Sequence, residues 1–264
     1  MWSLLEKTRL IGKLTQANNI ANGELPYNRI AETLGEVLDS NTYIIDSNGE
    51  IVGYTIQHDV NNDRINKMLE SEKLSEEYTK RVTSVTMTES NIDVTNELTA
   101  FPRELQDELS SSLTTIIPIY GAGERMGTII LGRFGMIFSD NDLVLGEYSA
   151  TVVGLQMMYQ QSHNIEEAVR QKSAVQMAIK TLSYTELRAV HAIVEELDNQ
   201  EEGRLVTSLI ADQKHITRSV IVNALRKLES AGIIETRSLG MKGTYIRIIN
   251  PYFTDSFLES IVHI

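Results

Sequence analysis

A predicted helix followed by a basic β-hairpin, in residues 211–247, constrains this chain more than any other stretch of its sequence. Thr217 is a candidate N-cap, and Gly232 is a candidate for the first residue beyond the helix. Between them, apolar residues recur at helical spacing, namely Val220, Val222, Leu225 and Leu228. We therefore expect an amphipathic helix that ends sharply.

The segment after this helix has the features of two short strands joined by a flexible turn. Ile233 and Ile234 begin the first strand, residues 239–243 contain two glycines, and residues 244–248 alternate as a strand does. A helix followed by such a hairpin is typical of a winged helix-turn-helix, which lays its helix in the major groove of DNA.

The distribution of charge favours the same interpretation. Residues 213–247 contain seven basic and two acidic residues, a net of +5, whereas the whole chain carries −12. Because an acidic protein does not attract DNA by its total charge, the local basic surface is the informative quantity. The alternative is a solvated basic helix beside an ordinary hairpin, and the coincidence of helix, hairpin and charge favours DNA binding.

Position along this segment assigns roles to individual residues. Residues at the start of a recognition helix meet base edges or phosphates. Arg218 is therefore a candidate for reading guanine, and Thr217 and Ser219 are candidates for phosphate contacts. Basic residues of the hairpin would contact the phosphate backbone. The predicted DNA-contacting residues are Thr217, Arg218, Ser219, Asn223, Arg226, Arg237 and Lys242.

Composition narrows the class of the whole chain. Its 264 residues suffice for one large or two modest domains, and the absence of cysteine excludes disulfides and thiolate chemistry. We find no signal peptide and no run of about 18 apolar residues, so we expect a cytoplasmic protein without a membrane span. No two of the five histidines lie within one helical turn of each other, and we predict no metal site.

The amino-terminal half is predicted to form a mostly antiparallel sheet with flanking helices. Amphipathic helices are expected at residues 2–18 and 28–38, and Asn48-Gly49 marks a hairpin turn. Pro118 indicates a sheet edge or a bulge. The predicted strands form two hairpins, residues 42–46 with 51–56 and residues 114–120 with 125–133.

The intervening segments predict less regular structure and a linker. Residues 83–100 are polar and lack periodicity, so we expect a long loop, followed by a short helix that begins at Pro102 and reaches residue 110. A capping cluster at Ser139 begins a long helix whose first half is apolar and whose second half is charged, with further helix at residues 172–182. The predicted α+β fold has a sensor-like domain at 1–138, a linker helix at 139–172 and a winged helix-turn-helix at 173–264.

An arginine beside an apolar patch indicates a ligand site. Arg64 lies in a predicted helix with Ile65, Met68 and Leu69, and a guanidinium binds a carboxylate through two hydrogen bonds. Residues 99–102, Thr-Ala-Phe-Pro, end the predicted loop in a way suited to a lid. This combination suits a small carboxylate with an apolar tail, and the alternative is an arginine that simply lies on the surface.

A glycine-rich segment, residues 121–127, presents a rival site. Its sequence GAGERMG could hold a phosphate, which would indicate a nucleotide-binding enzyme or switch. The segment lacks the Lys-Ser/Thr of a P-loop and precedes a strand, so a hairpin turn is favoured. No Ser-His-Asp arrangement or nucleophile elbow is visible, and we predict that the chain is not an enzyme.

Several motifs are similar to those of one family of regulators. Residues 216–243 closely resemble the signature of the CodY family, the global transcriptional regulators of low-GC Gram-positive bacteria. Further matches lie at residues 88–93, 99–102, 123–128 and 142–153. The resemblance implies a GAF-type sensor domain, a long linker helix and a winged helix-turn-helix. It also implies a homodimer, with further assembly left open, that represses transcription from an A/T-rich inverted repeat.

The resemblance further implies an effector and its site. The branched-chain amino acids isoleucine, valine and leucine, chiefly isoleucine, would raise DNA affinity, and no cofactor is implied. Arg64 would bind the α-carboxylate, and carbonyls near Thr99 and Phe101 would accept from the α-ammonium. Ligand binding would order residues 83–102 and favour the DNA-competent dimer. The implied pocket residues are Arg64, Thr99, Phe101, Pro102, Tyr43, Ile65, Met68, Leu74 and Tyr78.

One departure from the family concerns its second effector, GTP. Many members carry Ser-Arg-Arg-Gly in the first hairpin, and this segment is associated with GTP. The equivalent residues here are Asp46-Ser47-Asn48-Gly49. Both arginines are absent and an acid is present, which argues against a GTP response.

Overall fold

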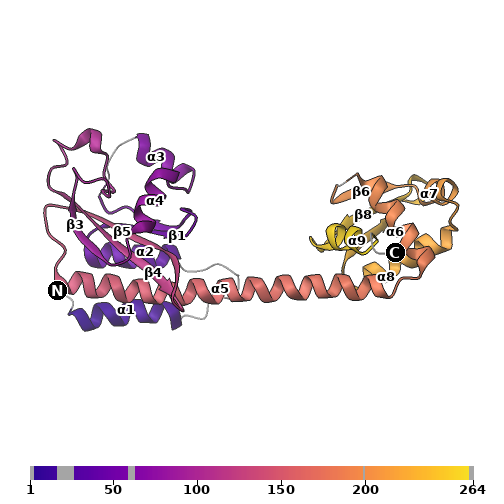
Figure 1. Cartoon of the computed structure of the whole chain (residues 1–264), viewed down its shortest axis with the longest axis horizontal. Coiled ribbons are helices and arrows are strands. Elements are labelled where there is room, and N and C mark those ends of the chain that lie inside the picture. Colours follow the sequence, from indigo (N-terminus) through magenta and orange to yellow (C-terminus); the bar gives the residue numbers. More distant parts are fainter. Residues whose placement is uncertain (1–2, 17–26, 59–62, 199, 262–264) are drawn as a thin grey trace. The chain divides into compact units, whose positions relative to one another are not determined.

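The chain divides into two units that each have their own core. The computed structural model describes residues 3–16, 27–58, 63–198 and 200–261. The N-terminal unit comprises residues 1–161, and the C-terminal unit comprises residues 162–264. One long helix, α5 (Asp140–Lys180), contributes residues to both units (Figure 1).

A five-stranded antiparallel sheet forms the centre of the N-terminal unit. Its strand order is β2-β1-β5-β4-β3. The two predicted hairpins are confirmed, because β1 pairs with β2 and β4 pairs with β5. The strands are β1 (Asn41–Asp46), β2 (Ile51–Thr55), β3 (Glu89–Asp93), β4 (Ser112–Gly121) and β5 (Glu124–Phe134).

Helices cover both faces of this sheet. Successive side chains of a strand point to opposite faces, so Ile116 and Ile117 of β4 enter separate cores. The core containing Ile117 lies under α1, α2 and the first half of α5, and the core containing Ile116 lies under α3 and α4 (Figure 1). The bounds of the covering helices are α1 (Leu4–Gln16), α2 (Tyr27–Leu38), α3 (Asp63–Glu70) and α4 (Glu76–Ser84).

The prediction of a loop at residues 83–100 was wrong. Helix α4 continues to Ser84, and Glu89–Asp93 form β3 at the edge of the sheet. Of this strand only Ile92 is buried, so its polar sequence carries no alternating signal. The helix expected from Pro102 to residue 110 was also wrong, because only one 3-10 turn, η2 (Arg103–Leu105), forms there.

Pro118 lies in an interior strand, but in a part of it that β3 does not reach. The pairing of β3 with β4 ends at Ile116, and the β4–β5 register shifts between Ile119 and Tyr120. Pro118 therefore removes no ladder hydrogen bond on the β3 side, and a β-bulge follows it. The predicted association with an edge or a bulge is confirmed in this form.

The predicted helices mostly have the expected positions, with shifted ends. The stretches expected to meet at residue 172 form one helix, α5, which continues to Lys180 because no proline interrupts the sequence. Ser139 caps this helix, since its hydroxyl accepts from the backbone N–H of Asp142 at 3.4 Å. Residues 2, 17 and 18 of the predicted first helix lie outside the described residues.

The C-terminal unit is a small helical domain with a three-stranded sheet of order β6-β8-β7. Strand β6 precedes the short helix α7 in the chain and pairs with β8. The elements are α6 (Tyr184–Leu197), β6 (Glu202–Leu205), α7 (Thr207–Lys214), α8 (Arg218–Ser230), β7 (Ile234–Ser238), the 3-10 turn η3 (Gly240–Lys242), β8 (Thr244–Ile248) and α9 (Phe253–Ile261).

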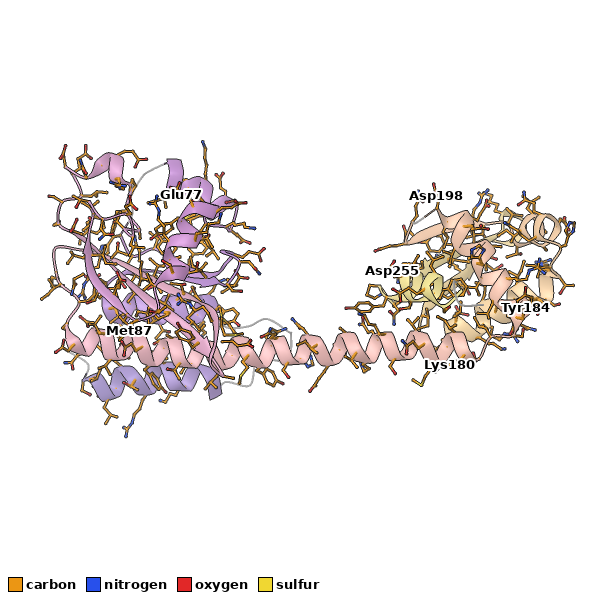
Figure 2. All side chains as sticks on the ribbon, in the orientation of Figure 1. Glu77, Met87, Lys180, Tyr184, Asp198 and Asp255 are labelled. Carbon is orange, nitrogen blue, oxygen red and sulfur yellow. The ribbon has the colours of Figure 1, made fainter. Side chains whose placement is uncertain are left out.

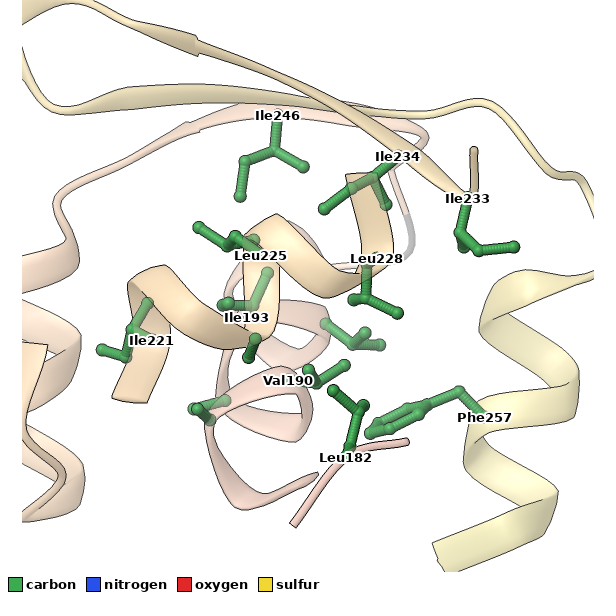
Figure 3. Close-up of a cluster of buried hydrophobic side chains, with 14 of the residues drawn as sticks. Leu182, Val190, Ile193, Ile221, Leu225, Leu228, Ile233, Ile234, Ile246 and Phe257 are labelled. Carbon is green, nitrogen blue, oxygen red and sulfur yellow. The ribbon is translucent and has the colours of Figure 1, made fainter. Parts of the chain in front are cut away.

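One apolar core holds these elements together. Ile221, Leu225 and Leu228 of α8 lie in one apolar cluster with Ile234 and Ile246 of the sheet, Val190 and Ile193 of α6 and Phe257 of α9 (Figure 3). These positions recur at helical spacing, so the opposite face of α8 is left exposed. Gly232 ends the helix with a φ of +69°.

Local hydrogen bonds fix the start of α6. Ser183 and Glu186 form a reciprocal capping box on α6, an arrangement that their spacing of three residues allows. Lys227 of α8 also donates to Glu186 at 2.8 Å. Together Lys227 and Ser183 hold the pKa of Glu186 below its usual value.

A buried arginine connects the end of the sheet to the beginning of α5. Arg133 of β5 is only 4% exposed. Its guanidinium donates to Leu38 O at 2.9 Å, Met136 O at 3.2 Å and Ile137 O, and it pairs with Asp142 at 3.0 Å. It also lies 4.1 Å from the centre of the Phe138 ring. The positive charge is therefore compensated from three chain segments.

We predict that the Asp142 carboxylate makes the free energy of unfolding depend on pH. Burial alone would raise the pKa of Asp142, but hydrogen bonds from Ser139 and Arg133 lower it below its usual value. A lowered pKa stabilises the folded state above the unfolded-state value of about 3.9, and this contribution disappears as pH falls through the folded-state pKa. Urea unfolding of wild type and Asp142→Asn should therefore show a stability gap that narrows from pH 7 to pH 3.

The exposed Asp140 of the same helix provides the control. Asp140→Asn should change the free energy of unfolding little at any pH in this range. A gap for Asp142→Asn that stays constant down to pH 3 would contradict the assignment.

Candidate functional site

A cavity of about 440 Å³ opens between α3, α4 and residues 99–102 of the N-terminal unit. The two helices and the turn between them contribute apolar and aromatic side chains, Ile65, Met68, Leu74 and Tyr78, together with lysines and serines. Seven of the nine residues predicted for a ligand pocket line it, namely Ile65, Met68, Leu74, Tyr78, Thr99, Phe101 and Pro102. The cavity is of a size usual for small-molecule sites, which are roughly 300–1,000 Å³.

Hydrogen bonds hold the segment that closes one side of this cavity. The Tyr78 hydroxyl of α4 donates to Leu98 O at 2.9 Å, and the backbone N–H of Ala100 donates to the Thr114 hydroxyl of β4 at 3.0 Å. The Phe101 N–H donates to the Thr99 hydroxyl at 3.2 Å. Residues 98–101 are thus attached both to a cavity helix and to the sheet.

The Phe101 ring packs against the sheet at Gly132, which has no side chain. A Cβ at Gly132 would lie 3.0 Å from Phe101 Cζ, so any other residue there would require the ring to move away from β5 by a few tenths of an ångström. Phe134 meets Phe101 edge-on, with ring centres 5.1 Å apart. Phe101 is consequently 5% exposed although it belongs to a connecting segment.

Two predicted pocket residues are not among those that line the cavity. Tyr43 of β1 is buried in the adjoining core with Leu74, and burial, aided by Tyr54, raises the pKa of Tyr43 to about 12. Arg64 is the second residue of α3, four positions before Met68, and its side chain lies outside what the structure describes. Its role stays a prediction.

The structure also adds cavity residues that the sequence reasoning did not identify. Lys67 and Lys73 line the cavity and supply positive charge beside its apolar walls. Lys67 follows Arg64 by three positions, so helical spacing from Arg64 could have indicated it. Lys73 belongs to an irregular turn, for which periodicity provides no signal.

The second candidate site is the exposed face of α8 and the hairpin that follows it. All seven predicted DNA-contacting residues are exposed, whereas the opposite face of α8 is buried. Thr217 occupies the N-cap position, as predicted, but its hydroxyl lies 3.0 Å from that of Ser219 and makes no capping hydrogen bond. Arg226 lies in the second half of the helix, and it lines a pocket to which Met177 of α5 also contributes.

The hairpin has the expected pairing and a tight turn. β7 and β8 pair from Ile234 with Ile248 to Ser238 with Thr244. Gly243 in the turn has a φ of +101°, and a Cβ there would lie 2.3 Å from the carbonyl oxygen of Leu205. The predicted wing is therefore confirmed as a β-hairpin that follows α8 in the C-terminal unit.

The basic residues in the range 213–247 form two groups, those with an acidic partner and those without one. Lys214 pairs with Glu195, Lys227 with Glu186, and Arg247 with Glu235. Within the described part of the chain the other four basic residues of this segment have no acidic partner, and they are Arg218, Arg226, Arg237 and Lys242. The unpaired cations are thus the four that position along the sequence assigned to DNA.

Family models match both units. Residues 3–181 match the CodY GAF-like domain, and residues 201–260 match the CodY helix-turn-helix domain. The chain belongs to the CodY family.

Individual CodY proteins resemble the chain over nearly its whole length. The global transcriptional regulator CodY of Lysinibacillus sphaericus (strain C3-41) is 51% identical over 257 residues, which cover 97% of this chain and 98% of the relative. That of Bacillus velezensis is 52% identical over 251 residues, covering 95% and 96%. The cofactor-binding GAF domain of the nutrient sensor CodY from Clostridium difficile is 33% identical, covers 60% of this chain and 99% of its own, and superposes with a TM-score of 0.42.

Membership of the CodY family makes the chain a transcriptional regulator with a GAF-like domain and a DNA-binding helix-turn-helix domain. No helix in the described ranges is long and apolar enough to cross a membrane. Nor do those ranges bring together three or more His, Asp or Glu side chains that could hold a metal ion.

The two hairpins considered as nucleotide sites have ordinary turns in this CodY protein. Ala122 and Gly123, both with positive φ, join β4 to β5, which confirms the hairpin interpretation of residues 121–127. In the first hairpin the Asp46 carboxylate accepts from the N–H groups of Asn48 and Glu50, each at 2.8 Å. This acid is therefore used to hold the turn.

We predict that Arg218→Glu abolishes operator binding while the protein stays folded. Arg218 is exposed at the first position of α8 and has no acidic partner, so its reversal opposes the phosphate backbone without disturbing the core. The lost base contact alone is worth about 1–3 kcal/mol, and the repulsion between the introduced carboxylate and the phosphates adds to this loss, so no operator binding should be detected. Gel-shift titration measures the affinity, and circular dichroism checks folding.

Arg170→Glu makes the same charge change at an exposed arginine of α5. This control should bind the operator nearly as wild type does. Unchanged binding by Arg218→Glu would locate the base-reading residues elsewhere.

Proposed function

We propose that this CodY protein represses transcription and binds its operators more tightly when a branched-chain amino acid, chiefly isoleucine, occupies the cavity between α3, α4 and residues 99–102. The cavity carries the proposal, because it combines apolar walls with cationic side chains and a buried aromatic closing segment. A free amino acid with a branched side chain has the matching chemistry.

The chemistry of each part of isoleucine has a counterpart in the cavity. Ile65, Met68 and Leu74 offer apolar contacts for the side chain. We assign the α-carboxylate to Arg64, because guanidinium binds carboxylate through two hydrogen bonds, with Lys67 and Lys73 adding positive potential. Backbone carbonyls near Thr99 and Phe101 would accept from the α-ammonium.

A short series of contacts offers a route from the cavity to α5. Phe101 lies on Gly132, and the next residue of β5 is Arg133, whose guanidinium binds Asp142 in the first turn of α5. A ligand that fixes Phe101 therefore acts one residue from the group that holds the start of α5. The ligand shifts the population toward the DNA-competent state only if it binds that state more tightly.

We further propose a homodimer that binds an A/T-rich inverted repeat, as the family resemblance implies. A two-fold symmetric operator requires two recognition helices. Self-association is supported by apolar side chains of α5 that are more than half exposed, namely Val144, Leu155, Ile165 and Val169.

We predict that isoleucine tightens operator binding and that Arg64→Ala abolishes this effect. A tenfold gain in affinity corresponds to a coupling of about 1.4 kcal/mol. Without the guanidinium the carboxylate loses its main partner, so operator affinity should no longer change with isoleucine, while binding in its absence stays as in wild type. Operator titrations with and without isoleucine measure both quantities.

Arg103→Ala supplies the matched control, because Arg103 is exposed in η2 and does not line the cavity. It should retain the full response to isoleucine. If Arg64→Ala also retains it, the proposed carboxylate contact is wrong.

We also propose that GTP is not an effector of this protein. Residues 46–49 contain no arginine, and Asp46 would repel a polyphosphate. Operator affinity should therefore be the same with and without GTP, and no GTP should be hydrolysed. A GTP effect without turnover would refute only this point, whereas turnover would refute the regulator interpretation in favour of a nucleotide-dependent enzyme.

A further inference from the structure

A second, smaller cleft lies in the C-terminal unit between α6 and the turn that joins α7 to α8. Its volume is about 240 Å³, and its lining combines apolar side chains with three basic ones. Tyr184, the first residue of α6, is 65% exposed at the surface (Figure 2). The lining residues are Tyr184, Leu187, Arg188, His191, Ala192, Lys214 and Ile216. We refer to this site as the cationic cleft.

The cationic cleft has more positive than negative charge. Arg188 and Lys214 are exposed cations, and the Arg188 guanidinium donates to the backbone carbonyl of Lys214 at 3.3 Å. One acid is in contact with the group, because Glu195 lies 2.7 Å from Lys214 and 3.7 Å from His191 Nδ1. The single carboxylate leaves one net positive charge when His191 is neutral.

The cationic cleft adjoins the start of the recognition helix. Ile216, in its wall, is followed directly by Thr217, the N-cap of α8. Thr217 makes no side-chain capping hydrogen bond, and its backbone carbonyl accepts from the N–H groups of Val220 and Ile221, so the Thr217 side chain caps neither of the first two N–H groups of this 13-residue helix, those of Arg218 and Ser219. Such an N-terminus favours an anion, and the cations beside it favour the same ligand.

We propose that the cationic cleft holds a backbone phosphate of the bound DNA, so that the operator interface extends from α8 onto α6 through Arg188. This inference rests on DNA binding by α8 and names a further contact of that site. Arg188 provides the charge, and the neighbouring Tyr184 hydroxyl and ring offer a hydrogen bond and an apolar surface for the sugar.

Size favours a phosphate of DNA over a free effector molecule. The cleft is smaller than the roughly 300–1,000 Å³ that is usual for small-molecule sites, and its cations are exposed rather than enclosed. A phosphodiester that is already delivered by the recognition helix needs only a shallow site. Free inorganic phosphate presents the same chemistry and is therefore one arm of the test.

Removing the arginine charge tests the contact. Arg188→Gln in the full-length protein should weaken binding to operator and to unrelated DNA alike, by roughly two- to fivefold. The slope of log affinity against log salt should fall by about 0.9, as expected for one lost phosphate contact. Arg170→Gln loses the same charge from an exposed arginine of α5 and should leave affinity and slope unchanged.

Removing the Glu195 carboxylate provides the converse test. The expected result is stronger DNA binding, which structural damage would not produce. Glu195→Gln frees Lys214 and His191 from their carboxylate partner and should strengthen DNA binding, again by roughly two- to fivefold. Glu196→Gln, at the exposed neighbouring acid, makes the same change in net charge and should have a smaller effect.

The outcomes separate this inference from the proposed function. If wild type fails to bind the operator, DNA binding itself is refuted. If wild type binds and Arg188→Gln matches Arg170→Gln in affinity and slope, only the phosphate contact is refuted. Inorganic phosphate that raises the thermal midpoint of wild type but not of Arg188→Gln, with DNA binding unchanged, would show a free-anion site and overturn the proposal.

Discussion

The cavity between α3, α4 and residues 99–102 depends on the packing of the Phe101 ring against the backbone of Gly132. The segment that connects β3 to η2 lies against the sheet through buried apolar side chains, among them Val94 and Phe101, which are 2% and 5% exposed. Here the missing side chain on β5 admits the ring, and the hydrogen bonds from Tyr78 and Ala100 hold the segment around it. The cavity wall is therefore built from the sheet outward, and a ligand that contacts Phe101 also acts on β5.

The same strand carries the connection to α5. Arg133 follows Gly132 and takes its hydrogen-bond partners from α2, from the segment before α5 and from Asp142. Because the charge is buried, displacing any one partner is costly, and the start of α5 is sensitive to small movements at the end of β5. In the C-terminal unit, the ion pairs of residues 213–247 leave four described cations of that segment without an acid, namely Arg218, Arg226, Arg237 and Lys242 on the exposed face of α8 and on its hairpin.

The sequence predicted the elements whose signal is local. The glycine after α8 and both hairpins of the N-terminal sheet follow from spacing and turn chemistry, and the structure has them where expected. β3 was missed because an edge strand with one buried residue has no alternating pattern. Lys73, Lys214 and Arg188 belong to candidate sites only because the fold brings them next to side chains that are distant in sequence. Periodicity cannot predict such proximity.

We propose that ligand binding in the cavity and operator binding are energetically coupled. The most direct test measures how operator DNA changes the affinity of the protein for isoleucine. Coupling between two binding sites is reciprocal, so DNA must change the affinity for isoleucine by the same factor as isoleucine changes the affinity for DNA. Isothermal titration of isoleucine into the protein, alone and with saturating operator, measures this factor. The account predicts that operator tightens isoleucine binding by the factor found in operator titrations. Identical isoleucine affinities with and without operator would contradict it.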